Sequence, residues 1–141
     1  MAERNMDMKK CPMPVQDPDV RNKNFDEVAL GYTYDMAVNE ARRCLNCPKK
    51  PCQSACPVQI DIPAFIERVA NEDMDGAFEI LSKSTSLPAV CGRVCPQENQ
   101  CEGKCVRGIK GEAVGIGRLE RFVADYHREH CTDTPEMPEQ N

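Results

Sequence analysis

The side chains with the most evident chemistry in this chain of 141 residues are its ten cysteines. Two blocks hold eight of them: the first reads C-x2-C-x4-C-x3-C-P, and the second reads C-x3-C-P-x4-C-x3-C. Thiolate is a soft ligand that binds zinc, copper and iron–sulfur clusters, so both blocks are predicted to bind metal. Their members are Cys44, Cys47, Cys52 and Cys56, and Cys91, Cys95, Cys101 and Cys105.

The first block has the form of a cluster-binding loop. Cys44 and Cys47 are two residues apart, so a tight turn can bring both sulfurs to one metal centre and direct backbone N–H groups toward it. Pro57 turns the chain after Cys56, and in two-cluster ferredoxins a similar Cys-Pro step sends the last cysteine to the other cluster. We therefore expect two [4Fe–4S] clusters that exchange ligands between the blocks.

This exchange predicts which cysteines share a cluster. The first cluster is expected to take three thiolates of the first block and one of the second, namely Cys44, Cys47, Cys52 and Cys105. The second cluster is expected to take Cys56, Cys95 and Cys101. It still needs one ligand, and spacing alone favours Cys91, which lies one helical turn before Cys95.

The charge around the first block suits an anionic cofactor. Residues 42–57 contain two Arg, two Lys and no acid, whereas the whole chain carries a net charge of −5. Cations near the sulfurs favour the more negative, reduced cluster and so raise its potential. A solvated basic loop would have the same composition, and the sequence leaves both interpretations open.

Zinc and disulfides are the alternatives for these cysteines. Two four-thiolate zinc sites would also use eight cysteines, and the chain would then be a structural interaction module without redox activity. Such sites usually pair two C-x2-C knuckles, and this sequence has one. Disulfides are disfavoured because residues 1–10 lack the apolar stretch of a secretory signal, so we expect a cytoplasmic protein with reduced thiols.

Composition disfavours several other functions. The net charge of −5 argues against a nucleic-acid partner, and the sequence has no run of about 18 apolar residues that would cross a membrane. It has no Ser/His/Asp set, carboxylate pair or phosphate loop, so we expect no catalysis by this segment alone. The apolar 40% includes the cysteines, so bound metal is expected to reinforce a thin core.

Four amphipathic helices are predicted to position the two blocks. They cover about residues 33–45, begin near Pro63, begin after Asp73, and cover about residues 113–128. The last helix has one apolar stripe, which consists of Ile116, Leu119, Phe122, Val123 and Tyr126. The predicted fold is all-α, a small helical domain whose irregular Cys-rich loops enclose the two clusters.

The predicted domain has a segment of different composition on each side. Residues 1–24 are expected to be a flexible N-terminal tail, because proline and asparagine interrupt any period there. Residues 25–131 are expected to form the helical two-cluster domain. Residues 132–141 are acidic and contain proline, which is typical of a linker.

The ordered motifs of this chain resemble a known module over about residues 20–130. It is similar to the N-terminal iron–sulfur domain of the NADPH-dependent glutamate synthase small (beta) subunit family, and also to the N-terminal domain of dihydropyrimidine dehydrogenase. The stretches that carry the resemblance are Phe25–Tyr32, Glu40–Cys47, Cys56–Val58, Ile62–Ile66, Leu87–Pro96 and Ile116–Phe122.

The resemblance implies an all-helical domain with two [4Fe–4S] clusters that acts inside a larger oxidoreductase. In that family the domain precedes an FAD- and NADPH-binding reductase in the same full-length chain, and residues 132–141 resemble the linker toward it. The clusters would relay electrons between FAD and an FMN enzyme, the large glutamate synthase-type subunit. The equivalent domain of another NAD(P)H-dependent reductase, such as dihydropyrimidine dehydrogenase, is the alternative.

The resemblance also changes the expected last ligand of the second cluster. In the family a Gln or Glu on the helix after the second block takes that place, and the matching residue here is Glu120. Helix geometry permits this, because Glu120 lies about 40° from Ile116 and about 60° from Val123 around the axis. Cys91 would then be a thiol beside the cluster.

Overall fold

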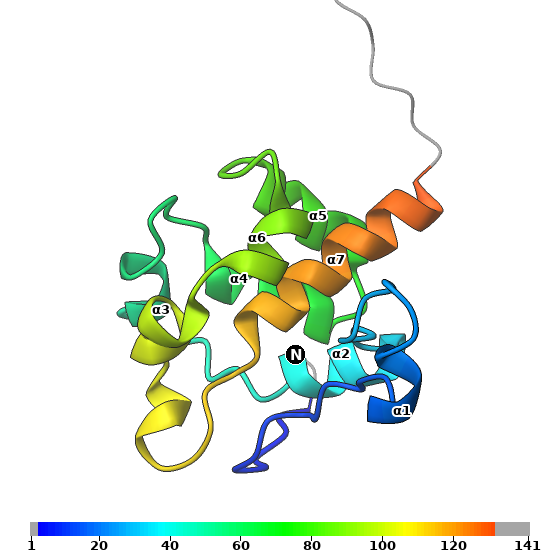
Figure 1. Cartoon of the computed structure of the whole chain (residues 1–141). Helices are drawn as coiled ribbons and strands as arrows, with labels where there is room; N and C mark the ends of the chain where they lie inside the picture. The colour runs from blue at the N-terminus through cyan, green and yellow to red at the C-terminus, as the bar shows by residue number, and fades with distance from the viewer. Residues whose placement is uncertain (1–2, 132–141) are drawn as a thin grey trace, which may run out of the picture.

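The computed structural model describes residues 3–131, and this range contains seven α-helices and three 3-10 helices joined by loops (Figure 1). The α-helices are α1 (Pro18–Arg21), α2 (Tyr34–Ala41), α3 (Pro51–Ser54), α4 (Ile62–Ala70), α5 (Met74–Ser82), α6 (Pro88–Val94) and α7 (Ile116–His130). The 3-10 helices are η1 (Gln97–Asn99), η2 (Glu102–Lys104) and η3 (Val106–Ile109).

The prediction of an all-α fold is confirmed. Strand-type pairing over residues 3–131 is limited to one isolated antiparallel bridge between Val15 and Ala29. No helix in this range has the length and apolar character that a membrane span needs. The linker predicted over residues 132–141 lies outside the described residues.

Helix α7 is the central element of the helical body, and α2, α4, α5 and α6 contact it (Figure 1). Its predicted stripe faces the core: Leu119 and Val123 are fully buried, together with Phe65 of α4 and Leu81 of α5. Through its contacts with α2, α5 and α6, helix α7 therefore connects the elements beside the first cysteine block with those of the second.

Capping residues set where the predicted helices begin. Asp61 accepts a hydrogen bond from the Ala64 N–H at the start of α4, and Asp73 accepts one from the Gly76 N–H at the start of α5. Helix α7 begins at Ile116 and not near residue 113, because the preceding backbone is engaged elsewhere. The carbonyls of Glu112 and Ala113 accept hydrogen bonds from the Arg43 guanidinium.

Two short helices were not predicted within the cysteine blocks. Helix α3 carries Cys52, helix α6 carries Cys91, and both start with a proline. With four and seven residues they are too short to produce an apolar period, so the sequence had favoured irregular loops there.

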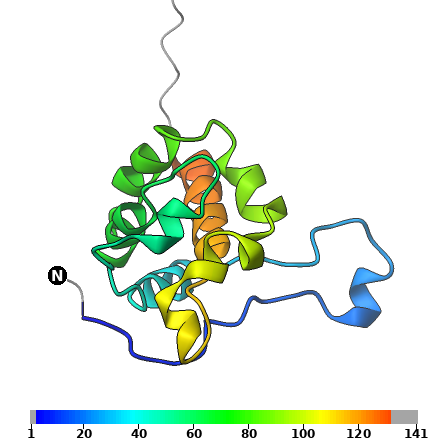
Figure 2. The same ribbon diagram turned by 90° about the vertical axis from the view of Figure 1, so that its left-hand side faces the viewer.

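Much of the segment predicted to be a flexible tail lies along the helical body. The Asn5 N–H donates to the Arg42 carbonyl over 3.0 Å, and the Glu112 N–H donates to the Met8 carbonyl over 2.8 Å. Residues 14–30, here called the arm, include α1, and this end of the arm extends away from the body (Figure 2). A domain boundary near residue 25 stays a prediction, and it would fall within this arm.

Candidate metal centres

Four cysteines from the two blocks line one small hollow, with a cavity volume of about 20 Å³. Cys44 and Cys47 follow α2, Cys52 lies in α3, and Cys105 lies between η2 and η3. The rest of the lining is mainly apolar and includes Pro51, Ile62, Pro63, Ile66, Val114 and Ile116. The structure therefore brings together the four residues predicted for the first cluster, and we call them the first group.

The thiols of the first group are close enough to influence one another. Burial raises the pKa of Cys44 to about 11, and nearby Cys52, Cys105 and Cys47 also raise it. A backbone hydrogen bond from Asn46 acts in the opposite direction, as does one from Gln53 to Cys52. These N–H groups point at sulfur, as the C-x2-C spacing predicts, and they would stabilise thiolates.

Left-handed backbone makes this arrangement possible. Asn46 has φ 49° and Lys50 has φ 43°, values that few residues other than glycine adopt. Both residues lie in the short loop between Cys44 and Cys52, where the chain must turn twice to aim three sulfurs inward. The Lys50 ammonium is held by Asp61 at 2.7 Å, which ties this loop to the start of α4.

A second set of donors gathers between α6, η2 and α7. Burial raises the pKa of Cys101 to about 12, with Glu102, Cys56 and Glu120 as charged neighbours that raise it further. Cys95 also has a raised pKa from burial and from its neighbours Cys91, Glu120 and Cys56. We call Cys56, Cys91, Cys95, Cys101 and Glu120 the second group.

Glu120 is the member of the second group whose side chain is buried with an oxygen atom left without a hydrogen bond. Its side chain is 6% exposed, and within residues 3–131 its Oε1 atom has no hydrogen-bond partner. Burial raises the pKa of this carboxyl to about 7. An unpaired buried carboxylate is costly, and a metal ligand role would remove that cost.

Cys91 is the other candidate for the last ligand in the second group. It is a neighbour of Cys95 and raises the pKa of that thiol, and its own sulfur is 3.8 Å from the Thr85 hydroxyl oxygen. Because both Cys91 and Glu120 are neighbours of Cys95, the identity of the last ligand stays a prediction. The unpartnered carboxylate favours Glu120.

The donors are not arranged for single metal ions. Within residues 3–131 no three His, Cys, Asp or Glu side chains come together as a site for one ion. A tetrahedral zinc ion draws four sulfurs to about 2.3 Å from one point. The four thiols of the first group instead line one hollow together.

The cations near the first block have partners elsewhere in the chain. Arg43, next to Cys44, is fully buried and donates to Glu40 over 2.6 Å. Glu40 also accepts from the Gly115 N–H at 2.8 Å and from the Cys11 N–H at 2.7 Å. Composition indicates only a local positive charge at Arg43 and gives no sign of its partner Glu40, which lies three residues earlier in α2.

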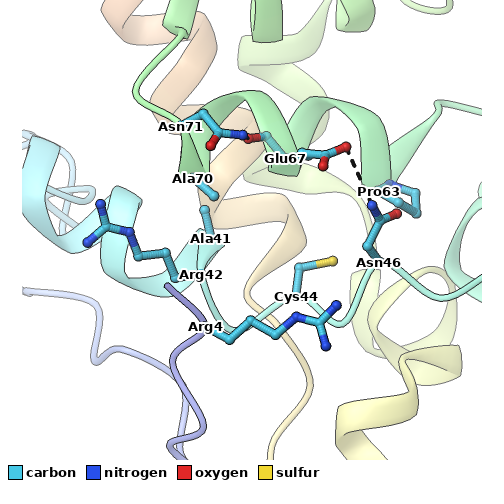
Figure 3. A pocket seen from close by; sticks show the side chains of 9 residues that line it. All are labelled: Arg4, Ala41, Arg42, Cys44, Asn46, Pro63, Glu67, Ala70 and Asn71. Carbon is cyan, nitrogen blue, oxygen red and sulfur yellow. Dashed lines mark hydrogen bonds between the residues drawn. The ribbon is translucent and has the colours of Figure 1, made fainter. Parts of the chain in front are cut away.

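A second hollow, with a cavity volume of about 60 Å³, lies beside Cys44 (Figure 3). Arg4 and Arg42 border it on one side, and Asn46 donates to Glu67 over 3.4 Å on the other. Cys44 lines both hollows, so its sulfur lies between the apolar interior of the first group and the surface.

Comparison with known proteins identifies the family to which these sites belong. The family model described as dihydropyrimidine dehydrogenase domain II, 4Fe-4S cluster, matches residues 21–132. The NAD-dependent dihydropyrimidine dehydrogenase subunit PreT of Escherichia coli K12 is 40% identical over 105 residues, 74% of this chain and 26% of that protein. The glutamate synthase [NADPH] small chain of Halomonas elongata is 37% identical over 131 residues, 89% of this chain and 28% of that protein. The chain therefore spans about a quarter of the length of these relatives.

Proposed function

Since this chain belongs to the family of dihydropyrimidine dehydrogenase domain II, a 4Fe-4S cluster domain, we propose that it holds two [4Fe–4S] clusters and relays electrons between them. The observation that carries the proposal is the composition of the two groups. Each group combines cysteines from both blocks, as a pair of clusters with exchanged ligands requires.

The ligand assignment follows the two groups. In this proposal Cys44, Cys47, Cys52 and Cys105 hold the first cluster, and Cys56, Cys95, Cys101 and Glu120 hold the second. Two features support the fit: the four thiols of the first group surround one largely apolar hollow, and the buried Glu120 carboxylate lacks a protein partner among the described residues.

The residues of the chain would tune and protect the bound groups. An iron–sulfur cluster supplies reversible electron transfer, with a potential that depends on ligands, hydrogen bonds and solvent exposure. Ile62, Ile66 and Ile116 keep water from the first site, while the Asn46 and Gln53 N–H groups stabilise its thiolates. Glu120 is a harder and less electron-donating ligand than cysteine, so it would give the second site a different potential.

We place this domain in an oxidoreductase like the glutamate synthase small chain. The relatedness to that chain extends over 89% of the present sequence, which supports this choice. The parent protein would bind NADPH and FAD, and the clusters would pass electrons between FAD and an FMN-containing large subunit. The second candidate is a subunit of the dihydropyrimidine dehydrogenase type, which the 40% identity to PreT favours.

Metal analysis of the chain purified without oxygen tests the cluster proposal. We expect about eight iron atoms and as many acid-labile sulfides per chain, brown colour, and EPR signals after reduction. A Cys47→Ser variant should lose about half of the iron, whereas the control Cys131→Ser, outside both groups, should lose none. A colourless, folded chain with zinc and no iron would refute the electron-transfer proposal and support a structural zinc module.

A further inference from the structure

Four charged side chains connect the arm to α6 and α7, the helices next to Cys95 and Glu120 of the second group. They are Glu27 of the arm, Arg93 of α6, and Arg121 and Asp125 of α7, and we call them the clamp. Arg93 donates from Nε to Glu27 at 2.6 Å and from a terminal nitrogen to Asp125 at 2.7 Å. Arg121 donates to the same Glu27 carboxylate at 3.1 Å.

The clamp lies next to two members of the second group. Arg93 is two residues before Cys95 on the same chain segment, and Arg121 directly follows Glu120. The helices touch between these positions, because a Cβ atom built on Gly92 would lie 2.5 Å from the Arg121 backbone nitrogen. Any change in the separation of α6 and α7 therefore moves Cys95 relative to Glu120.

Helix α6 packs closely on α7 at Gly92, but few of its apolar side chains are buried. Pro88 is its buried residue, whereas Val90 is 48% exposed and Val94 is 71% exposed. Arg93 compensates with directed hydrogen bonds: besides the bonds to Glu27 and Asp125, it donates to the Ala89 carbonyl at 2.9 Å. Its planar guanidinium holds both carboxylates at once, which a lysine ammonium cannot do in the same geometry.

We propose that the clamp positions the second metal site by fixing α6 against α7, so that Cys95 and Glu120 stay at the separation one bound cluster needs. Glu27, Arg93 and Asp125 are thus positioning residues that act through the ligands and do not touch the cluster. The inference rests on the proposed function for the identity of the bound group. It applies to the second site alone, because the first group lies against core side chains such as Ile62 and Ile66.

Two substitutions of Arg93 test the clamp in the 141-residue chain, purified without oxygen. In Arg93→Gln we expect iron to fall from about eight to about four atoms per chain, with the EPR signal of one cluster retained. Arg93→Lys keeps the positive charge but loses the planar guanidinium, so this variant should lose the same half of the iron. The control is Glu79→Gln, which alters another exposed ion pair, formed with Lys83 on the surface, and should keep all the iron.

Amide hydrogen exchange of the metal-free chain gives a second readout that does not depend on clusters. Both Arg93 variants should speed exchange in α6 at least tenfold and leave α4 unchanged. Three outcomes would refute the role proposed for the clamp. They are full iron in both variants, equal loss of iron from both sites, and an Arg93→Lys chain that behaves like the original protein. An original chain without iron would instead refute the proposed function, and exchange in α6 would still decide on the clamp.

Discussion

Replacing Gly92 by alanine should separate α6 from α7 and weaken the second site. The added Cβ would lie 2.5 Å from the Arg121 nitrogen and 2.8 Å from the Arg121 Cα, both of which are backbone atoms. A rotamer change cannot relieve this contact, so α6 must shift by roughly 1 Å to reach ordinary van der Waals separation. Overpacking of this kind costs about 1–3 kcal/mol, and the better helix propensity of alanine returns up to about 1 kcal/mol.

Denaturant unfolding and iron analysis measure these two effects. We expect Gly92→Ala to lower the free energy of unfolding of the metal-free chain by about 1–2 kcal/mol. Prepared without oxygen, the variant should bind about half the iron of the original chain. Gly108→Ala is the matched control, because its Cβ would meet nothing closer than Ala113 at 3.8 Å. A Gly92→Ala chain as stable and as iron-rich as the control would refute the close contact between the two helices.

Three further substitutions test a buried ion pair, a buried carboxylate and an exposed ring. Glu40→Gln leaves the Arg43 charge unpaired in the interior, so denaturant unfolding should show a loss of about 3–5 kcal/mol; a change below 1 kcal/mol would mean that the pair is not buried as described. Glu120→Gln removes a buried carboxylate, and it should stabilise the metal-free chain by about 1–3 kcal/mol at pH 8; lower stability would contradict the unpartnered carboxyl. Phe25→Ala should leave the melting temperature within about 1 °C of the original, because the ring is fully exposed, and a larger drop would place Phe25 in a packed environment.

Local patterns in the sequence were sufficient to predict the longer helices. The stripe from Ile116 to Tyr126 has the period of a helix, and α7 follows it with a later start. That start could not be predicted, because the carbonyls of residues 112 and 113 bond to Arg43, about 70 residues earlier in the chain. A contact between distant polar groups leaves no period in the sequence.

The same distinction applies to the candidate sites. The Cys-Pro step after Cys56 predicts an exchange of ligands between the blocks. The structure brings cysteines of both blocks near one another, and the ligand assignment stays a prediction. The clamp gave no such signal, because Glu27 and Arg93 are 66 residues apart and each resembles an ordinary surface charge. Short-range spacing thus predicts candidate ligands, whereas the contacts around those residues depend on the tertiary fold.

The two groups are held by different forces, and this difference predicts the order in which they fail. Ile62, Ile66 and Ile116 line the first hollow and also belong to the hydrophobic core, so the first site is maintained as long as the core is intact. The second site depends on α6, which packs on α7 at Gly92 and is also tied to its surroundings by the partly exposed ion pairs of the clamp. Salt screens such pairs and leaves apolar packing largely unaffected. Raising the ionic strength should therefore release iron from the second site first, and simultaneous loss from both sites would show that the core and the clamp are not independent.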